Sequence, residues 1–234
     1  MKAEIIKDYS EIVDCMQPLL SLLNERQHIT VLEATRVASY GKHESIYECG
    51  SSPDHLLCVL TGQVHIYCDG VGGRSQIMRI LAPGQFFGYR AFLANEPYVT
   101  AASAFEATRL CTVPMPLIAQ FMNESIPLCQ FFVRELATDL GISDQRTVGL
   151  TQKHMRGRMA EAILYLEEHF GTEDDNHTLA TRITRDELAQ LSNMTTSNAI
   201  RTLSAFSTEG IVEVHGRRII VCDHERLVHL NKMG

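Results

Sequence analysis

The sequence predicts an α+β chain in which a β-sandwich or barrel is followed by a long helical segment and a winged helix-turn-helix. Between residues 40 and 116, short β-prone runs alternate with turns containing glycine or proline, which is typical of an all-β domain. From residue 118 to residue 170, apolar residues recur at helical spacing. The last quarter holds two short helical patterns and then two β-prone runs around a glycine. We therefore place domain limits at residues 1–122, 123–152 and 153–234.

Composition argues against a membrane or secreted protein. The chain has 234 residues, of which 45% are hydrophobic, and a net charge of −7, so it can bury a substantial core. It contains no apolar run long enough to span a bilayer, and its first residues are charged rather than signal-like. The seven cysteines are odd in number and lack a framework spacing. We therefore expect free thiols and a cytoplasmic location.

The expected barrel is built from one longer and several short runs. Residues 5–40, which precede the expected strands, look helical but have only a weak apolar periodicity. They contain no residues to which we can assign a chemical role. The predicted strands lie within residues 45–50, 55–60, 64–68, 75–81, 86–87 and 101–114, with turns at 61–62, 69–70, 83–84 and 95–97.

The middle segment carries a heptad pattern. Apolar and small residues alternate in steps of four and three: Cys129, Val133, Leu136, Leu140, Ser143, Thr147 and Leu150. This spacing favours a helix that pairs with a second copy of itself, although a helix packed only on its own barrel is the alternative. Gly141 and Gly149 weaken the helix by about 1 kcal/mol each relative to alanine.

Residues 184–206 predict two helices joined by a tight turn. Thr184 and Glu187 have the spacing of a capping box, and Thr195 is expected to cap the second helix. The buried face of that helix has the i, i+4, i+7 spacing of Ala199, Leu203 and Phe206. An ordinary helical hairpin has the same pattern, but a helix-turn-helix places its second helix in the major groove of DNA.

The residues that follow favour the DNA-binding interpretation. Two β-prone runs, 211–214 and 218–221, flank a turn with Gly216, which predicts a hairpin of the winged variety. Arg217 and Arg218 at its tip suit a phosphate backbone, although exposed arginines are common on turns. Between residues 182 and 218, five arginines face four acidic residues. The basic charge is therefore local, and the acidic remainder limits non-specific DNA affinity.

Three glycine-centred motifs in the first half connect the chain to a known family. They are Gly50 and Gly62 followed by Val64, Ile66 and Tyr67; the segment Pro83-Gly84-Gln85-Phe86-Phe87-Gly88; and Tyr98 with Thr100 and Ala101. In this order they resemble the double-stranded β-roll of cyclic nucleotide-binding domains. Together with the winged helix-turn-helix, the chain resembles, over roughly residues 20–222, bacterial transcription regulators of the cyclic-AMP receptor protein/fumarate-nitrate reduction regulator (Crp/Fnr) family.

The resemblance implies a function for each domain. It implies a β-roll sensor over residues 1–122, a dimerisation helix and hinge over 123–152, and a DNA-binding domain over 153–234. It also implies a homodimer that binds double-stranded DNA at a near-palindromic operator, with RNA polymerase as a further partner. The dimer seam would then consist of Cys129, Val133, Leu136, Leu140, Thr147 and Leu150.

The DNA-reading residues follow the family with one departure. Family members commonly have Glu and Arg at the positions of Ser197 and Arg201. Arg201 suits bidentate contact with guanine, whereas Ser197 tolerates several bases, and Asn198 could read adenine. Each of the smaller polar residues could instead contact phosphate or cap the helix. The candidate DNA-binding residues are Arg185, Thr195, Thr196, Ser197, Asn198, Arg201, Arg217 and Arg218.

The effector pocket departs from the family more strongly. Members that bind cyclic nucleotides have Phe-Gly-Glu and, later, Arg-[Ser/Thr]-Ala, whereas this chain has Tyr89 in place of the Glu and Val99 in place of the Arg. A buried phosphate without its guanidinium is costly, which argues against cyclic AMP, although Arg90 lies near in sequence and could substitute. The family arrangement implies a pocket lined by Gly88, Tyr89, Arg90, Val99, Thr100 and Ala101 and, across the dimer, by Ser143 and Asp144.

Other effectors of the family require particular protein side chains as ligands. An iron–sulfur cluster needs four thiolates, but only Cys15 lies near the N-terminus and no C-x-x-C occurs. Haem needs one or two axial ligands, and ten histidines and nine methionines leave it open. A redox disulfide among Cys49, Cys58 and Cys68 is conceivable, although strand cysteines are more often packed as small hydrophobes.

Two further functional hypotheses stay open at this point. One is a regulator with a vestigial pocket, filled by side chains such as Tyr89, that binds DNA without an effector. The other is a metal-dependent enzyme of the cupin type, but its His-x-His motif is missing here, as are a phosphate-binding loop and a nucleophile elbow. We therefore expect a regulator and no enzymatic activity.

Overall fold

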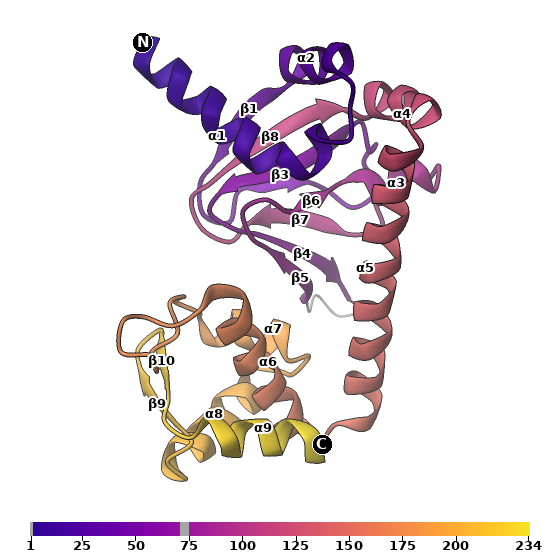
Figure 1. Ribbon diagram of the computed structural model, residues 1–234. Coiled ribbons are helices and arrows are strands. Elements are labelled where there is room, and N and C mark those ends of the chain that lie inside the picture. The colour runs from indigo at the N-terminus through magenta and orange to yellow at the C-terminus, as the bar shows by residue number, and fades with distance from the viewer. Residues whose placement is uncertain (1, 71–74) are drawn as a thin grey trace. The chain divides into compact units, whose positions relative to one another are not determined.

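The computed structural model describes residues 2–70 and 75–234, with side chains from Tyr9 onward. These residues form two compact units. The first comprises the chain up to Cys68 and Met78–Leu140, and the second comprises Asp69–Ile77 and Gly141–Gly234. The helix α5 (Ile126–Gln152) belongs to both, since the division falls between Leu140 and Gly141. Figure 1 shows α5 as one continuous helix.

The first unit is built on two four-stranded sheets, which confirms the predicted β-roll (Figure 1). One sheet has the order β1-β8-β3-β6, with β1 (Arg36–Tyr40), β8 (Thr108–Pro114), β3 (His55–Thr61) and β6 (Phe86–Phe87). The other has the order β2-β7-β4-β5, with β2 (Ser45–Tyr47), β7 (Ala101–Ala104), β4 (Val64–Asp69) and β5 (Ser75–Leu81). Strands that are neighbours in a sheet come from distant parts of the sequence, so the chain passes repeatedly from one sheet to the other, as in a roll.

The expected continuous strand over residues 101–114 was wrong. The chain turns between Ala104 and Thr108, and β7 and β8 enter different sheets. The turn packs against Gly62, whose φ is 77°. A Cβ at Gly62 would lie 2.4 Å from the carbonyl oxygen of Ala107, so only glycine permits this approach.

Helices close the first unit on one side. α1 (Lys2–Leu20) lies against β3, and its residues Met16, Leu19 and Leu20 are buried with Leu56 in one apolar cluster. α2 (Glu25–Ala34) begins with a capping box between Asn24 and Gln27. The expectation of helix through residue 40 was wrong at its end, because β1 pairs with β8 instead. α3 (Tyr89–Leu93) and α4 (Met115–Glu124) complete the unit with the first half of α5.

The second unit holds the predicted winged helix-turn-helix. Its helices are α6 (Met155–Phe170), α7 (Arg185–Leu191), α8 (Thr196–Thr208) and α9 (His224–Met233), and its hairpin consists of β9 (Val212–His215) and β10 (Arg218–Val221). Ile163, Leu166, Leu188 and Phe206 are each fully buried in its core. α9 was not anticipated from the sequence.

Within the described residues, none of the helices is both long and apolar enough to cross a membrane.

Candidate DNA-binding face and effector pocket

α7 and α8 each begin with a side-chain cap. Thr184 accepts a hydrogen bond from the backbone N–H of Glu187 at 3.1 Å, and the Glu187 carboxylate accepts one from the N–H of Thr184 at 2.7 Å. Thr195 caps α8 by accepting from the N–H of Asn198 at 3.2 Å. Both predicted caps are present. Each cap satisfies backbone groups at the first turn of its helix that would otherwise lack partners.

The turn itself explains why α8 leaves α7 at this point. Asn193 has a φ of 50°, a conformation that asparagine tolerates better than most residues. Met194 is buried, and its N–H donates to the carbonyl of Ala189 at 2.9 Å. The Met194 side chain thus packs into the core at the point where the chain reverses direction.

α8 has one buried and one exposed face, as the spacing predicted. Ala199, Leu203 and Phe206 are buried, whereas Ser197 and Arg201 are exposed. Ser204 continues the exposed face one turn after Arg201. Asn198 is half-buried beside the cap. The exposed face can therefore present Ser197 and Arg201 to a ligand without disturbing the core.

Thr196 is engaged within the protein. Its hydroxyl donates to Asp186 Oδ1 at 2.9 Å, and Gln190 Nε2 donates to Asp186 Oδ2 at 2.8 Å. Asp186 thus links the first turn of α7 to the first turn of α8. This contact gives Thr196 a positioning role in the structure as it stands.

Ile200 is a surface residue that the sequence reasoning missed. Its side chain is 45% exposed on α8, between Ser197 and Arg201. With Arg185, Ser204 and Val214 it helps to line a hollow of about 400 Å³. The sequence contained a signal for this exposure, because Ile200 is apolar but lies outside the i, i+4, i+7 set of residues that forms the buried face of the helix. Such an exposed apolar side chain on a groove-reading helix fits the methyl group of thymine.

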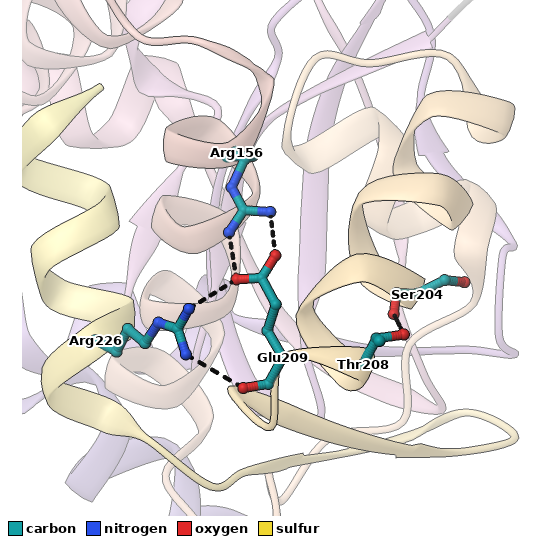
Figure 2. Close-up of polar contacts among 5 residues, drawn as sticks. All are labelled: Arg156, Ser204, Thr208, Glu209 and Arg226. Atoms are coloured by element: carbon teal, nitrogen blue, oxygen red, sulfur yellow. Dashed lines mark hydrogen bonds and ion pairs between the residues drawn. The ribbon is translucent and has the colours of Figure 1, made fainter.

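The far end of α8 is held by two arginines. Arg156 of α6 donates to both carboxylate oxygens of Glu209, the residue that ends α8, at 2.7 Å each. Arg226 of α9 donates to the Glu209 carboxylate at 3.0 Å and to its carbonyl at 3.2 Å. Figure 2 shows both guanidinium groups converging on Glu209, beside the hydrogen bond from Thr208 to Ser204. The hydrogen bonds from Arg156 lower the pKa of Glu209.

The hairpin presents one of its two arginines freely to solvent. Gly216 makes the turn with a φ of 62°, and Arg217 beside it is exposed. Arg218 instead pairs with Glu173, so its charge is partly neutralised within the protein. Arg185, at the first position of α7, is half-buried, and its Nη1 atom is buried without a hydrogen-bond partner among the described residues. Arg217 is therefore the better placed of the two hairpin arginines for a phosphate.

Gly88 and Tyr89 are the first two residues of the predicted effector pocket. Gly88 precedes α3 with a φ of 88°, and a Cβ there would lie 2.8 Å from the His55 carbonyl oxygen. Tyr89 is only 2% exposed, packs on Phe132 of α5 and donates to Asp139 Oδ2 at 3.3 Å. Burial raises the pKa of Tyr89. The residue in the family's Glu position is thus a buried phenol that contacts α5.

Arg79 of β5 is a second residue that the sequence reasoning missed. It pairs with Asp139 of α5, the carboxylate that also accepts from Tyr89. An arginine within the otherwise apolar run Ile77–Leu81 was the signal, since a charge on such a strand needs a partner. Arg79, Tyr89 and Asp139 form a cluster that joins the roll to the first half of α5.

The remaining predicted pocket residues lie in different settings. Val99 is 53% exposed, and Arg90 is exposed and pairs with Glu96 at 2.7 Å. Thr100 hydrogen-bonds Tyr47, whose ring stacks on Tyr98 with centroids 3.8 Å apart. Ala101 is buried in β7, and Ser143 and Asp144 are exposed on the part of α5 that belongs to the second unit.

These residues fit a cyclic nucleotide poorly. The position that would pair with the phosphate is an exposed valine, and the carboxylate that would bind the ribose is replaced by Tyr89. Arg90, the alternative cation, is directed to Glu96. Among the residues that the structure describes, no group of three or more His, Cys, Asp or Glu side chains is arranged to hold a metal ion.

The predicted dimer seam is apolar and partly exposed on α5. Val133 and Leu140 are 59% and 63% exposed, and Ile126 extends the same heptad spacing at 73%. Cys129 and Leu136 are half-buried, with Leu136 packed against the core of the first unit. Farther along, Thr147 is exposed and Leu150 is half-buried. Another face of α5 buries Leu128 and Phe132, so the exposed stripe is distinct from the face that packs on the roll.

Comparison with known proteins assigns both parts of the chain. The model of the cyclic nucleotide-binding domain matches residues 37–125, and that of the Crp-like helix-turn-helix domain matches residues 157–230. The chain is 22% identical over 189 residues to the CRP-like cAMP-activated global transcriptional regulator of Mycobacterium tuberculosis, which covers 80% of this chain and 84% of that one. It is 24% identical over 187 residues to the electron transport regulator A of Shewanella oneidensis, and this match covers 80% of this chain and 74% of that one.

Solved structures agree on the fold. The structure of FixK2 from Bradyrhizobium japonicum superposes with a TM-score of 0.75 at 24% identity, covering 84% of this chain and 97% of that one. With the two domain models matched in the same order as the two units of the structure, the chain belongs to the Crp/Fnr family of DNA-binding transcription regulators, and it is a regulator rather than an enzyme.

Proposed function

We propose that the chain acts as a homodimer that binds a near-palindromic operator and is controlled through its β-roll by an effector other than cyclic AMP. The observation that carries the DNA-reading part is the exposed face of α8, where Arg201 is exposed on a helix that begins with the Thr195 cap and ends at Glu209. Thr195, Ser197 and Asn198 begin that face, and Arg185 and Arg217 flank it. RNA polymerase is a further proposed partner, and the proposed location is the cytoplasm.

The homodimer rests on the apolar stripe of α5. Ile126, Val133 and Leu140 expose large apolar side chains at heptad spacing, and such a seam is stabilised when a second helix covers it. Two DNA-binding units related by a twofold axis would contact half-sites about one helical turn, or roughly 34–36 Å, apart.

A different effector is supported by the side chains of the roll. Tyr89 and Val99 replace the groups that would hold a ribose and a cyclic phosphate. Arg79 of β5 already pairs with Asp139, the carboxylate that also accepts a hydrogen bond from Tyr89. An effector with its own anionic group could compete with Asp139 for Arg79, whereas a neutral one could not.

A regulator with a vestigial pocket is the second candidate. The buried phenol of Tyr89 stands at the family's Glu position, and the rings of Tyr47 and Tyr98 stack on each other in the same unit. Such a protein would bind its operator without any added molecule.

The experiment that tests the proposal begins with DNA selection. Purified full-length protein is used to enrich bound sequences from a random pool, with and without a cell extract of small molecules. Enrichment of an inverted repeat, lost in Arg201→Ala but kept in Arg182→Ala, supports sequence reading by α8. Recovery of no common motif in either condition would contradict it.

The effector arm uses the enriched operator. Titration with cyclic AMP should leave operator affinity unchanged, and an affinity increase at micromolar cyclic AMP would overturn that part of the proposal. Full affinity in the absence of extract would favour the vestigial pocket. An absorption spectrum of protein purified anaerobically, before and after haemin, tests haem separately, because a stoichiometric Soret band would identify it as the cofactor.

A further inference from the structure

Three cysteines meet where α1 packs on the sheet of the first unit. Cys15 lies on α1, Cys58 on β3 and Cys111 on β8. The sulfur atoms of Cys15 and Cys58 are 3.3 Å apart. Cys58 and Cys111 are direct register partners in the antiparallel pair of β3 and β8, so their side chains share one face of the sheet. The cluster is therefore formed by three separate elements rather than by neighbouring positions in the sequence.

The three thiols differ in their access to solvent. Cys58 and Cys111 are each 1% exposed, whereas Cys15 is half-buried. Cys15 also lines a hollow of about 620 Å³ together with Asp14, Pro18 and Gly84. A small solute can therefore reach Cys15 from this hollow, whereas Cys58 is buried and does not line the hollow.

The surroundings also distinguish the two sulfur atoms chemically. The hydrogen bond from the Cys58 thiol lowers the pKa of Cys15 to about 7, aided by the backbone of Gly84 and opposed by burial. The same contact and burial raise the pKa of Cys58. The nearby Glu11 carboxylate, which raises the pKa of Cys15 slightly, is paired with Arg109 at 2.7 Å. At neutral pH Cys15 is thus the nucleophile of the pair. When Cys15 is protonated, its thiol donates a hydrogen bond to the Val59 carbonyl oxygen at 2.9 Å.

We propose that Cys15 and Cys58 are a redox-active pair that a hydroperoxide converts into a disulfide between α1 and β3. The Cys15 thiolate attacks one peroxide oxygen, so that an S–O bond forms and the O–O bond breaks. The departing oxygen takes up a proton, which leaves a sulfenic acid on Cys15. Cys58 then attacks the Cys15 sulfur, the S–O bond breaks, and the hydroxyl leaves as water with the Cys58 proton.

The reaction is balanced by the peroxide alone. The two thiols lose two electrons and two protons, and hydrogen peroxide is reduced to two molecules of water. The 3.3 Å between the two sulfur atoms is already close to contact, so the second step requires little movement of either element. The product would link α1 covalently to the roll. The modification goes beyond the proposed operator binding and does not depend on it.

The test is peptide mapping of the full-length reduced protein after brief treatment with hydrogen peroxide. We expect one linked pair of peptides, Cys15 with Cys58, and an intact mass lower by about 2 Da, reversed by dithiothreitol. The initial rate should rise about tenfold between pH 6 and pH 8, as the thiolate fraction of Cys15 rises. No variant is needed for this measurement, so a folding defect cannot obscure it.

Three variants sharpen the assignment. In Cys58→Ser, dimedone should trap a sulfenic acid on Cys15, because the serine hydroxyl can keep the hydrogen bond to Cys15 but cannot form the disulfide. In Cys222→Ser, which alters an exposed cysteine of the second unit, the Cys15–Cys58 link should form unchanged. Cys111→Ala should also keep the link, and circular dichroism confirms that each variant is folded.

Several results would overturn the proposal. They are a link between Cys58 and Cys111, a link between two chains through an exposed cysteine, oxidation of Cys15 to a sulfinic acid while Cys58 stays reduced, or no reaction of Cys15. None of these outcomes bears on operator binding, which is measured separately.

Discussion

Arg156 of α6 binds both carboxylate oxygens of Glu209, the residue that ends α8, and Arg226 of α9 holds the same residue from another side. Arg156 also lies over the ring of Phe206, 4.9 Å from its centroid, and Phe206 is fully buried. The C-terminal end of α8 is thus held by two other helices of the same unit. Because the proposed function places α8 in the DNA groove at a set angle, we expect these contacts to affect DNA affinity as well as stability.

We expect Glu209→Gln to lower both the melting temperature of the second unit and its operator affinity. The amide keeps the shape of the side chain but loses the charge that both arginines contact. Glu168→Gln, which alters an exposed glutamate of α6, is the matched control. Thermal unfolding and fluorescence anisotropy with operator DNA measure the two effects, and equal behaviour of the two variants would contradict the assignment.

The same pair predicts a pH dependence. Pairing holds the folded pKa of Glu209 below its usual value of 4.5. The pair therefore stabilises the folded state fully above about pH 4.5, and this contribution is lost as the pH falls through the lower folded value. Between pH 6 and pH 3 the wild type should lose more stability than Glu209→Gln, measured by urea unfolding at each pH.

Ile200 should read a thymine methyl group. Its side chain is exposed on α8, next to Arg201 in the sequence. Replacing the contacted thymine with deoxyuridine removes one methyl group, so wild-type affinity should fall by about 0.8 kcal/mol, or roughly fourfold. Ile200→Ala should lower affinity for the thymine site and abolish the difference between the two bases. A variant that still prefers thymine would assign the contact to another residue.

The two hairpin arginines should behave differently. Arg217 is exposed, whereas Arg218 pairs with Glu173. Arg217→Ala should weaken binding to all DNA sequences alike and reduce the salt dependence by about one phosphate contact per subunit. Arg218→Ala, with the same change in charge, should alter the salt dependence less. Binding isotherms at several salt concentrations decide between them.

Whether a contact of the fold or of the candidate site could be predicted from the sequence depended on how far apart its two residues lie along the chain. The capping box of Thr184 and Glu187 was predicted because its partners are three residues apart and their backbone geometry is fixed by the helix itself. Arg156 and Glu209 are separated by 53 positions and Arg79 and Asp139 by 60, and no local pattern relates such partners. The turn between β7 and β8 was missed because it lacks the glycine or proline that marked the other turns; the glycine that permits it is Gly62.

The Arg79–Asp139 pair supplies a prediction for the effector region. Asp139→Asn leaves the partly buried Arg79 without its counter-charge, so the first unit should lose about 1–2 kcal/mol of stability. Tyr89→Phe removes the other donor to Asp139 and should cost less. If the three side chains act as one cluster, the double variant should lose less than the sum of the single variants. Additive effects in urea unfolding would show that Tyr89 and Asp139 act independently.

The α5 stripe predicts the oligomeric state. Val133 and Leu140 lie one heptad apart on α5, away from the face that buries Leu128 and Phe132, and both are largely exposed in a single chain. Placing a charge at each, in Val133→Asp with Leu140→Asp, would oppose two charges across a paired seam. Because neither side chain supports the core, the variant should stay folded and sediment as a monomer.

Operator binding should follow the change in oligomeric state. A monomer contacts one half-site at a time, so affinity for the inverted repeat should fall on the order of 100-fold while affinity for a single half-site changes little. Thr138→Asp, an exposed substitution on the same helix outside the seam, is the control and should remain dimeric. If the double variant still sediments as a dimer, the seam lies elsewhere on the chain. If it is monomeric but binds the repeat as tightly as the wild type, the two DNA-binding units do not act together, and the twofold operator would have to be abandoned.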